Sequence, residues 1–416
     1  MFYKKIPLLL FFVPLFAFSE RIKFSLDTET GEEETVVTVP LEWNEKWISG
    51  GTSETYNHEL ARVACVLSDS AYCDVEGTTR SLVSNYVSLG VKKSDIELHY
   101  DINYDAPIIG NNQAAHSFAN VHLKNGKDLV FIVIRGTTRN ANEWISNINI
   151  SDTSRTAQEI HEGFYYTELE IHKELIYYLL THKLSPENTS FLITGHSRGG
   201  AVANLLGQHM SDEGYFSKEN IYVYTFAAPN IASKKNYEGR DYNFIWNIVN
   251  PEDVVPTVPP CREGWDYNKP GHMLSLFSYW TVTPGLYEKE YLPKINSWFN
   301  KFCARDYYPF KIGTFIPSII TRGLTGFYET VDGYYASRLR VSKKIESLFW
   351  KLFPAKGKEL DVDEESGSAS RLFDKLAATF NEQTNGLLDY SAFAFSDMHS
   401  CKTYLSFMLS FDEKTV

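Results

Sequence analysis

The sequence predicts an α/β fold in which a mainly parallel β-sheet is covered by helices on both faces. Apolar runs of strand length recur at residues 119–123, 129–134, 191–194, 221–226 and 244–249. Strands that are apolar throughout are typical of parallel sheets buried on both faces. Stretches with helical spacing alternate with these runs, as expected of α/β folds. The chain has 416 residues, 43% of them hydrophobic, which is sufficient for a large core.

Two helices and a β-hairpin are predicted beside this sheet. Residues 57–71 repeat apolar side chains at a helical period. Residues 160–180 predict a longer helix, whose core-facing side chains are expected to be Phe164, Leu169, Ile176 and Leu180. Residues 22–25 and 36–39 alternate in polarity across a Thr-Gly-Glu turn, which is typical of a hairpin.

A helical insertion is predicted at residues 281–390. Its expected helices are a first one with apolar residues at helical spacing (Tyr291, Ile295, Trp298, Phe299 and Phe302) and two more near 331–353 and 370–380. The block interrupts the alternation of strands and helices, so we interpret it as a cap inserted into a core made by residues 20–280 and 391–416. We interpret its aromatic stripe as core rather than as a lipid-contacting surface.

The first 19 residues are predicted to be a signal peptide. Lys4 and Lys5 precede an apolar run at residues 6–18, and Ala17-Phe18-Ser19 places small residues where a signal peptidase reads them. The run is shorter than the ~20 residues that cross a bilayer. We therefore expect cleavage before Glu20 and a secreted or extracytoplasmic protein.

The charge and the cysteines narrow the classes of partner and cofactor. A formal net charge of −12 disfavours nucleic acid and anionic membranes as partners, so any lipid contact would be apolar. The five cysteines match no zinc spacing. Cys65 and Cys73 fall in one predicted helix, about 12 Å apart and too far to bridge, so buried thiols are expected. No spacing indicates a metal or a phosphate loop, and no cofactor is expected.

The strongest chemical signal is a G-x-S-x-G motif between a predicted strand and a predicted helix. It comprises Gly195, Ser197 and Gly199. Such a motif places the serine hydroxyl on a strained turn at the edge of a sheet, and glycines are needed because the turn leaves no room for side chains. The following helix directs its N-terminal N–H groups at any anion that forms beside the serine.

A nucleophilic serine needs a base and an orienting carboxylate, which follow the serine in the order acid, then histidine. Asp253 lies directly after the last apolar run and is the candidate acid. The histidines beyond it are His272 and His399, and chain order alone does not separate them. His196, inside the motif, is expected to pack behind the turn rather than react.

Several segments resemble the class 3, or fungal-type, lipase family, with secreted bacterial members most similar. They are residues 133–137 (VIRGT), 195–201 (GHSRGGA), 226–229 (FAAP), 253–256 (DVVP) and the Asp-x-His-Ser…Tyr stretch at 397–404. The resemblance covers residues 55–275 and 395–410. It implies an α/β-hydrolase fold and ester hydrolysis at lipid surfaces. It also favours His399 over His272 as the base, because His399 occupies the family's late D-H-x-x-Y type segment.

The resemblance further implies an oxyanion hole formed by Thr137 and Arg198. Residues 138–147 match the family's lid position, but they are polar rather than amphipathic. The Arg198 side chain, where many members have an apolar residue, either meets an anionic head group or pairs with a nearby acid. The expected activity is an exported lipase or esterase acting on a lipid or small ester. The alternatives are a phospholipase, acyltransferase or thioesterase with the same triad, or an inactive surface interaction protein. The oligomeric state is left open.

Overall fold

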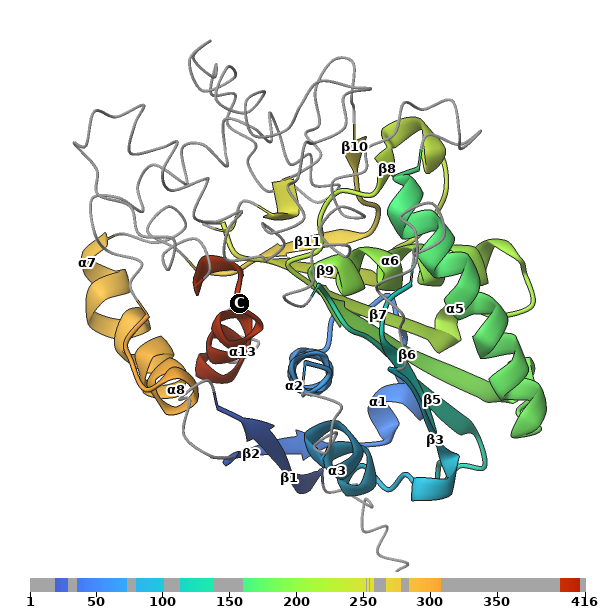
Figure 1. Ribbon diagram of the computed structural model, residues 1–416, viewed down its shortest axis with the longest axis horizontal. Coiled ribbons are helices and arrows are strands. Elements are labelled where there is room, and N and C mark those ends of the chain that lie inside the picture. Colours follow the sequence, from blue (N-terminus) through green and yellow to red (C-terminus); the bar gives the residue numbers. More distant parts are fainter. Residues whose placement is uncertain are drawn as a thin grey trace, which may run out of the picture.

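A seven-stranded sheet forms the centre of the molecule (Figure 1). The computed structural model describes residues 19–28, 36–72, 80–100, 113–137, 160–251, 253, 255–257, 267–277, 284–307 and 397–411. In spatial order the strands are β11 (His272–Ser275), β9 (Ile245–Val249), β7 (Ile221–Phe226), β6 (Thr189–His196), β5 (Asp128–Ile134), β4 (His116–His122) and β3 (Ile96–His99). Five strands run parallel to one another: β5, β6, β7, β9 and β11. At the other edge, β4 pairs antiparallel with both β5 and β3. The mainly parallel sheet is confirmed.

Both faces of this sheet are covered, as the apolar runs predict. Every residue of β6, β7 and β9 is buried. Successive side chains of β5 alternate between two hydrophobic clusters, since neighbouring strand residues point to opposite faces. One cluster includes α5 (Glu162–Thr181) and α6 (Arg198–Asp212), and the other includes α2 (His58–Ser70) and α13 (Cys401–Ser410) (Figure 1). This is the layered arrangement of an α/β-hydrolase fold.

Helix α5 forms where it is predicted, but its buried face is partly wrong. Phe164 is buried and Leu169 is half-buried, whereas Ile176 and Leu180 are 37% and 73% exposed. The buried residues of α5 are Gly163, Phe164, Thr167, Glu168, Ile171, His172, Leu175, Tyr178 and Leu179. These residues follow the helical period more closely, but three of them are polar, so a search for apolar spacing alone selected the wrong stripe.

The predicted hairpin is confirmed and longer than expected. Strands β1 (Glu20–Asp27) and β2 (Val36–Trp43) pair antiparallel, and their buried residues pack on the same side as α2 and α3 (Arg80–Ser88). Asn57 caps α2 by accepting a hydrogen bond from the N–H of Leu60. Helix α2 ends at Ser70, and just beyond it the Tyr72 hydroxyl lies 2.8 Å from His196 Nδ1. Cys65 and Cys73 therefore do not share this helix, and Cys73 lies outside the described residues.

The start of the predicted insertion packs into the core. Helix α7 (Pro284–Leu286) and a π-helix (Tyr287–Tyr291) lead into α8 (Leu292–Cys303), which lies beside α13 (Figure 1). Ile295, Phe299 and Phe302 are buried in the cluster that contains α2 and α13, which confirms the aromatic stripe as core. Cys65, Cys303 and Cys401 are buried free thiols, as expected.

The remaining described elements are short. They are α1 (Lys46–Ser49), the paired strands β8 (Ala232–Ser233) and β10 (Tyr267–Asn268), and 3-10 turns at Lys93–Asp95, Pro186–Asn188, Lys218–Asn220, Lys234–Asn236 and Val255–Thr257. Residues 1–18 of the predicted signal peptide, the expected lid position at 138–147 and the helices expected at 331–353 and 370–380 lie outside the described residues. Within the described ranges, no helix combines the length and apolar character needed to cross a membrane.

Candidate active site

Ser197 lies on a sharp turn between β6 and α6. Strand β6 ends at His196, α6 begins at Arg198, and Ser197 between them has φ of 57° and ψ of −129°. A non-glycine residue held in this sparsely populated region of backbone angles costs about 1–3 kcal/mol. The surrounding structure must therefore impose this conformation on Ser197. The Ser197 N–H donates to the carbonyl oxygen of Phe226 at 2.8 Å, which fixes the turn to the end of β7.

The glycines of the motif are required by backbone contacts. A Cβ at Gly199 would lie 2.1 Å from the carbonyl oxygen of Ile134, and a Cβ at Gly195 would lie 2.4 Å from the carbonyl carbon of Gly199. Gly136 is equally restricted, since its Cβ would lie 2.5 Å from the His196 carbonyl oxygen. The end of β5 therefore passes directly against the turn that presents Ser197.

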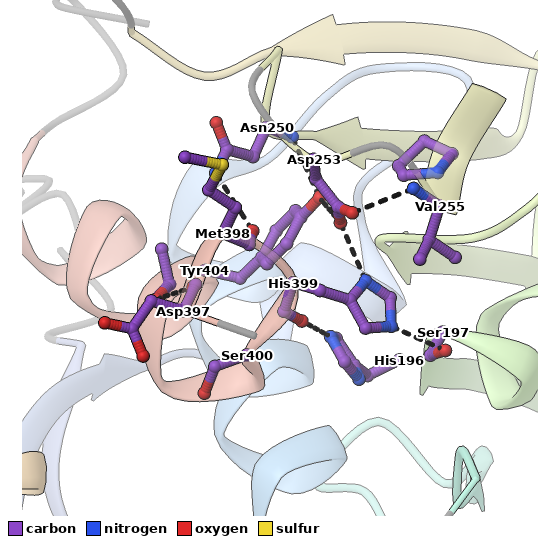
Figure 2. Close-up of polar contacts among 12 residues, drawn as sticks. His196, Ser197, Asn250, Asp253, Val255, Asp397, Met398, His399, Ser400 and Tyr404 are labelled. Atoms are coloured by element: carbon purple, nitrogen blue, oxygen red, sulfur yellow. Dashed lines mark hydrogen bonds and ion pairs between the residues drawn. The ribbon is translucent and has the colours of Figure 1, made fainter. Parts of the chain in front are cut away.

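The structure brings Ser197, His399 and Asp253 into one hydrogen-bonded row (Figure 2). The Ser197 Oγ lies 2.8 Å from His399 Nε2, and His399 Nδ1 lies 2.8 Å from Asp253 Oδ2. Ser197 and His399 are each 8% exposed, and Asp253 is 1% exposed. Each residue comes from a different place in the chain: the turn after β6, the loop after β9, and the segment just before α13.

His272 lies elsewhere. It begins the edge strand β11, where its ring stacks on Trp246 with the ring centroids 4.3 Å apart. Since His399 occupies the position beside Ser197, the geometry favours His399 over His272 as the base.

Asp253 is held by donors from two further elements. Its Oδ2 accepts the hydroxyl of Tyr404 at 2.8 Å, and its Oδ1 accepts the backbone N–H of Val255 at 2.9 Å (Figure 2). Tyr404 also accepts the backbone N–H of Asn250 at 2.9 Å, so α13 is tied to the loop that carries the acid. The sequence alone indicates no role for Tyr404. Its only signal was its place in the family-like segment, because its partner is 151 residues away.

His196 braces the same site from behind Ser197. Its Nε2 lies 2.7 Å from the His399 carbonyl oxygen, and its Nδ1 lies 2.8 Å from the Tyr72 hydroxyl. Burial, and then the neighbouring His399, hold the pKa of His196 well below its usual range. Because a carbonyl only accepts, the neutral ring donates from Nε2 and accepts from Tyr72 at Nδ1. His196 thus packs behind the turn, as the sequence predicts.

Comparison with known proteins supports the resemblance found in the sequence. The family model of class 3 lipases matches residues 131–263, which contain Ser197 and Asp253. Residues 131–263 are thus similar to the class 3 lipase family. The matched segment begins in β5 and ends after the loop that carries Asp253, so it excludes His399.

Individual relatives of the matched segment are distant. A lipase from Rhizomucor miehei is 28% identical over 40% of this chain and 48% of its own. Secreted mono- and diacylglycerol lipase 1 from Fusarium solani is 24% identical over 38% of this chain and 47% of its own. The match to this chain thus spans about half the length of these curated relatives. A solved triacylglycerol lipase structure is 21% identical, with a TM-score of 0.43, over 55% of this chain and 83% of that one.

The class 3 lipase pattern assigns the oxyanion hole to Thr137 and Arg198. Arg198 is the first residue of α6, directly after Ser197, and Thr137 follows the Gly136 that lies against the turn. The Arg198 side chain is 1% exposed and donates to the Gln113 carbonyl oxygen at 2.8 Å and to Thr167 Oγ1 at 2.9 Å. The guanidinium is therefore buried and bonded to two acceptors of the protein itself rather than directed at solvent.

A buried lysine supports the loop that carries Asp253. Lys269 Nζ donates to the Pro256 carbonyl oxygen at 2.6 Å and to Asn230 Oδ1 at 3.1 Å. Complete burial lowers the pKa of Lys269 to about 7, although the nearby Asp253 carboxylate opposes this shift. At neutral pH this lysine is thus close to losing its charge.

Replacing Lys269 with methionine is expected to change how stability depends on pH. An unfolded lysine has a pKa of about 10.4, so above pH 7 the unfolded chain binds a proton that the folded chain does not. Wild-type stability therefore gains up to about 1.4 kcal/mol per pH unit between pH 7.5 and 9.5 relative to Lys269→Met. Urea unfolding of both proteins at each pH measures this gain. Lys173→Met, at a 69% exposed side chain, is the control and should follow the wild type. Parallel curves for wild type and Lys269→Met would contradict the lowered pKa.

Proposed function

We propose that this protein is an exported serine ester hydrolase that cleaves carboxylic esters of acylglycerols or related lipids. The observation that carries the proposal is the row of Ser197, His399 and Asp253, joined by two 2.8 Å contacts on a strained turn. A nucleophile, a base and an orienting carboxylate in this arrangement are suited to acyl transfer.

The geometry supports a two-step reaction through an acyl-enzyme. Ser197 Oγ attacks the ester carbonyl while His399 Nε2 accepts its proton and then delivers it to the leaving alcohol. Asp253 keeps the Nδ1 proton of His399 in place and stabilises the imidazolium. The N–H groups of Thr137 and Arg198 would donate to the tetrahedral oxyanion. Water, activated by His399, then releases the fatty acid and restores Ser197.

Two further observations support the substrate class and the location. The relatives from Rhizomucor miehei and Fusarium solani are named as lipases, the second as a secreted mono- and diacylglycerol lipase. The N-terminal pattern of lysines, apolar run and small residues supports export by cleavage before Glu20. The proposed substrate is therefore an uncharged lipid ester, which the exported protein would hydrolyse outside the cytoplasm.

The proposal is tested with p-nitrophenyl esters from C2 to C16 and with mono-, di- and triacylglycerols. Hydrolysis should occur, and a fluorophosphonate probe should label the wild type at Ser197; Ser197→Ala serves as the blank for both assays. If glycerol is present and the products are acylglycerols instead of free fatty acid, the enzyme would be a transferase. Preference for phospholipids or thioesters would replace the proposed substrate. Absence of both hydrolysis and probe labelling would overturn the hydrolase assignment and favour an inactive surface protein.

A further inference from the structure

A second group of reactive side chains lies at the antiparallel edge of the sheet. His99 in β3 and His116 in β4 are directly opposite each other in the strand register. Their rings are stacked, with centroids 4.5 Å apart and planes within 6°. Glu174, from α5, reaches this pair from the helix that covers the sheet. None of these residues contacts the Ser197 row through any bond described above.

One atom from each side chain converges on a common point. Glu174 Oε2 lies 2.6 Å from His116 Nε2 and 3.6 Å from His99 Nδ1, and the three ligand atoms all lie within 4.8 Å of one another. Donors bound tetrahedrally at 2.0–2.1 Å to one zinc ion lie ~3.3 Å apart. The two separations to Glu174 bracket that value, so small side-chain movements would complete the set.

Two of the converging atoms are buried and face each other alone. Among the described residues, His116 Nε2 and Glu174 Oε2 have no hydrogen-bond partner other than each other, and the His116 side chain is 6% exposed. His116 Nδ1 lies 2.9 Å from the Ala114 carbonyl oxygen, which only accepts, so Nδ1 carries a proton. In the neutral ring Nε2 is then a bare acceptor that faces a carboxylate oxygen at 2.6 Å. Two acceptors at that distance need a cation between them, either a proton or a metal ion.

The surroundings of both histidines resemble those of metal ligands. A ligating histidine usually directs its other ring nitrogen at a carbonyl or a carboxylate. His116 does so with Ala114, and His99 Nε2 lies 3.7 Å from Glu97 Oε2. Glu97 is itself held by His182 Nε2 at 3.2 Å.

We propose that His99, His116 and Glu174 bind one divalent transition-metal ion, of which Zn²⁺ fits the ligand set best. Two imidazoles and one carboxylate are ligands that zinc accepts, with a water molecule in the fourth position. His99 and Glu174 have 32% and 42% exposed side chains, so the ion can enter from solvent. The sequence predicts no metal site because the ligands are separated along the chain and meet only through the pairing of β3 with β4.

The position of the site indicates a structural role. It joins β3, β4 and α5, and the adjacent Ala115 carbonyl oxygen accepts the Arg135 N–H at 2.8 Å. Arg135 is two residues before Thr137, at the end of β5. A bound ion would therefore fix the sheet edge beside the loop proposed to stabilise the oxyanion, without entering the reaction.

A second cluster offers a matched control. Glu168, His172 and His209 lie at the contact of α5 with α6, with their potential ligand atoms also within 4.8 Å. There, however, His209 Nδ1 already has a hydrogen bond to Glu168 Oε1 at 2.8 Å. His172 Nε2 lies 3.1 Å from Glu213 Oε2, a carboxylate outside this set. Because the two histidines already face the carboxylates of two different residues, we expect no zinc at this cluster.

The test is calorimetric titration of ZnCl₂ at pH 7.5 into the full chain, dialysed first against EDTA. We expect one zinc per wild-type chain, at least tenfold weaker binding in His116→Gln and in Glu174→Gln, and no change in His209→Gln. Co²⁺ titration should give visible absorption bands that the same two variants lose. Glu174→Gln alters a half-exposed helix residue, so it should unfold at the wild-type temperature in EDTA and keep the result independent of folding.

Three outcomes would overturn the proposal. The first is a wild type that binds no zinc. The second is equal zinc affinity of wild type, His116→Gln and Glu174→Gln, which would mean adventitious surface binding. The third is loss of zinc only in His209→Gln, which would assign the ion to the other cluster. In the first case the contact between His116 and Glu174 is a proton-mediated ion pair.

Discussion

Replacing His399 with alanine is expected to reduce kcat for ester hydrolysis on the order of 10⁵- to 10⁶-fold, as loss of the base in other serine hydrolases does. Without an acceptor 2.8 Å from its Oγ, Ser197 keeps its proton and attacks only as a weak neutral hydroxyl. The stated loss corresponds to about 7–8 kcal/mol in activation free energy. The measurement is kcat with a short-chain p-nitrophenyl ester, after the unfolding temperature has shown that the variant is folded.

His272→Ala is the matched control, because His272 is the other histidine that the chain order allows as base. Its ring stacks on Trp246 at the sheet edge, so its loss should lower stability and leave kcat within a few-fold of the wild type. Full activity in His399→Ala would contradict the proposed base. A His272→Ala variant that is folded but as inactive as the serine variant would assign the base to His272 instead.

The sheet and the turn that presents Ser197 could be predicted because their signals are local. Strands buried on both faces need uninterrupted apolar runs, and β6, β7 and β9 lie where such runs occur. The G-x-S-x-G motif reflects backbone contacts within a few residues of the turn and with the end of β5. The base could not be predicted from local signals. The order of residues along the chain does not separate His272 from His399, and only the segment that resembles the lipase family favours His399.

What the sequence did not show depends on contacts between distant segments. Tyr404 and Asp253 meet because α13 packs beside the loop after β9, and nothing near either residue indicates this. The polar residues on the buried face of α5 have the same origin. Glu168 pairs with His209 on α6, and His172 pairs with Glu213, the residue directly after α6. A search for apolar periodicity treats such residues as exposed, and it therefore misplaced the buried face.

Asp253→Asn is expected to reduce kcat by about 10⁴-fold while the fold is kept. In the wild type, all three neighbours of the carboxylate are donors: His399 Nδ1, the Tyr404 hydroxyl and the Val255 N–H. An asparagine amide has one acceptor oxygen and one donor nitrogen. If the nitrogen faces His399, the imidazole must place its proton on Nε2, where it no longer accepts from Ser197. If the oxygen faces His399, the nitrogen opposes the Val255 N–H, and the negative charge that stabilises the imidazolium is lost.

The variant Tyr404→Phe distinguishes two contributions of Asp253 to kcat: the charge of its carboxylate and the position in which that carboxylate is held. It removes one donor to Oδ2 and leaves the carboxylate, so a loss of about tenfold is expected, from a hydrogen bond to a charged group worth about 1.5 kcal/mol or more. The measurement is kcat for both variants across pH 5–9 with the same ester. If Asp253→Asn lost no more activity than Tyr404→Phe, the carboxylate would contribute position alone. A much larger loss in Asp253→Asn, at every pH in that range, would show that the carboxylate does more than hold its position: it fixes the proton of His399 on Nδ1 and stabilises the imidazolium.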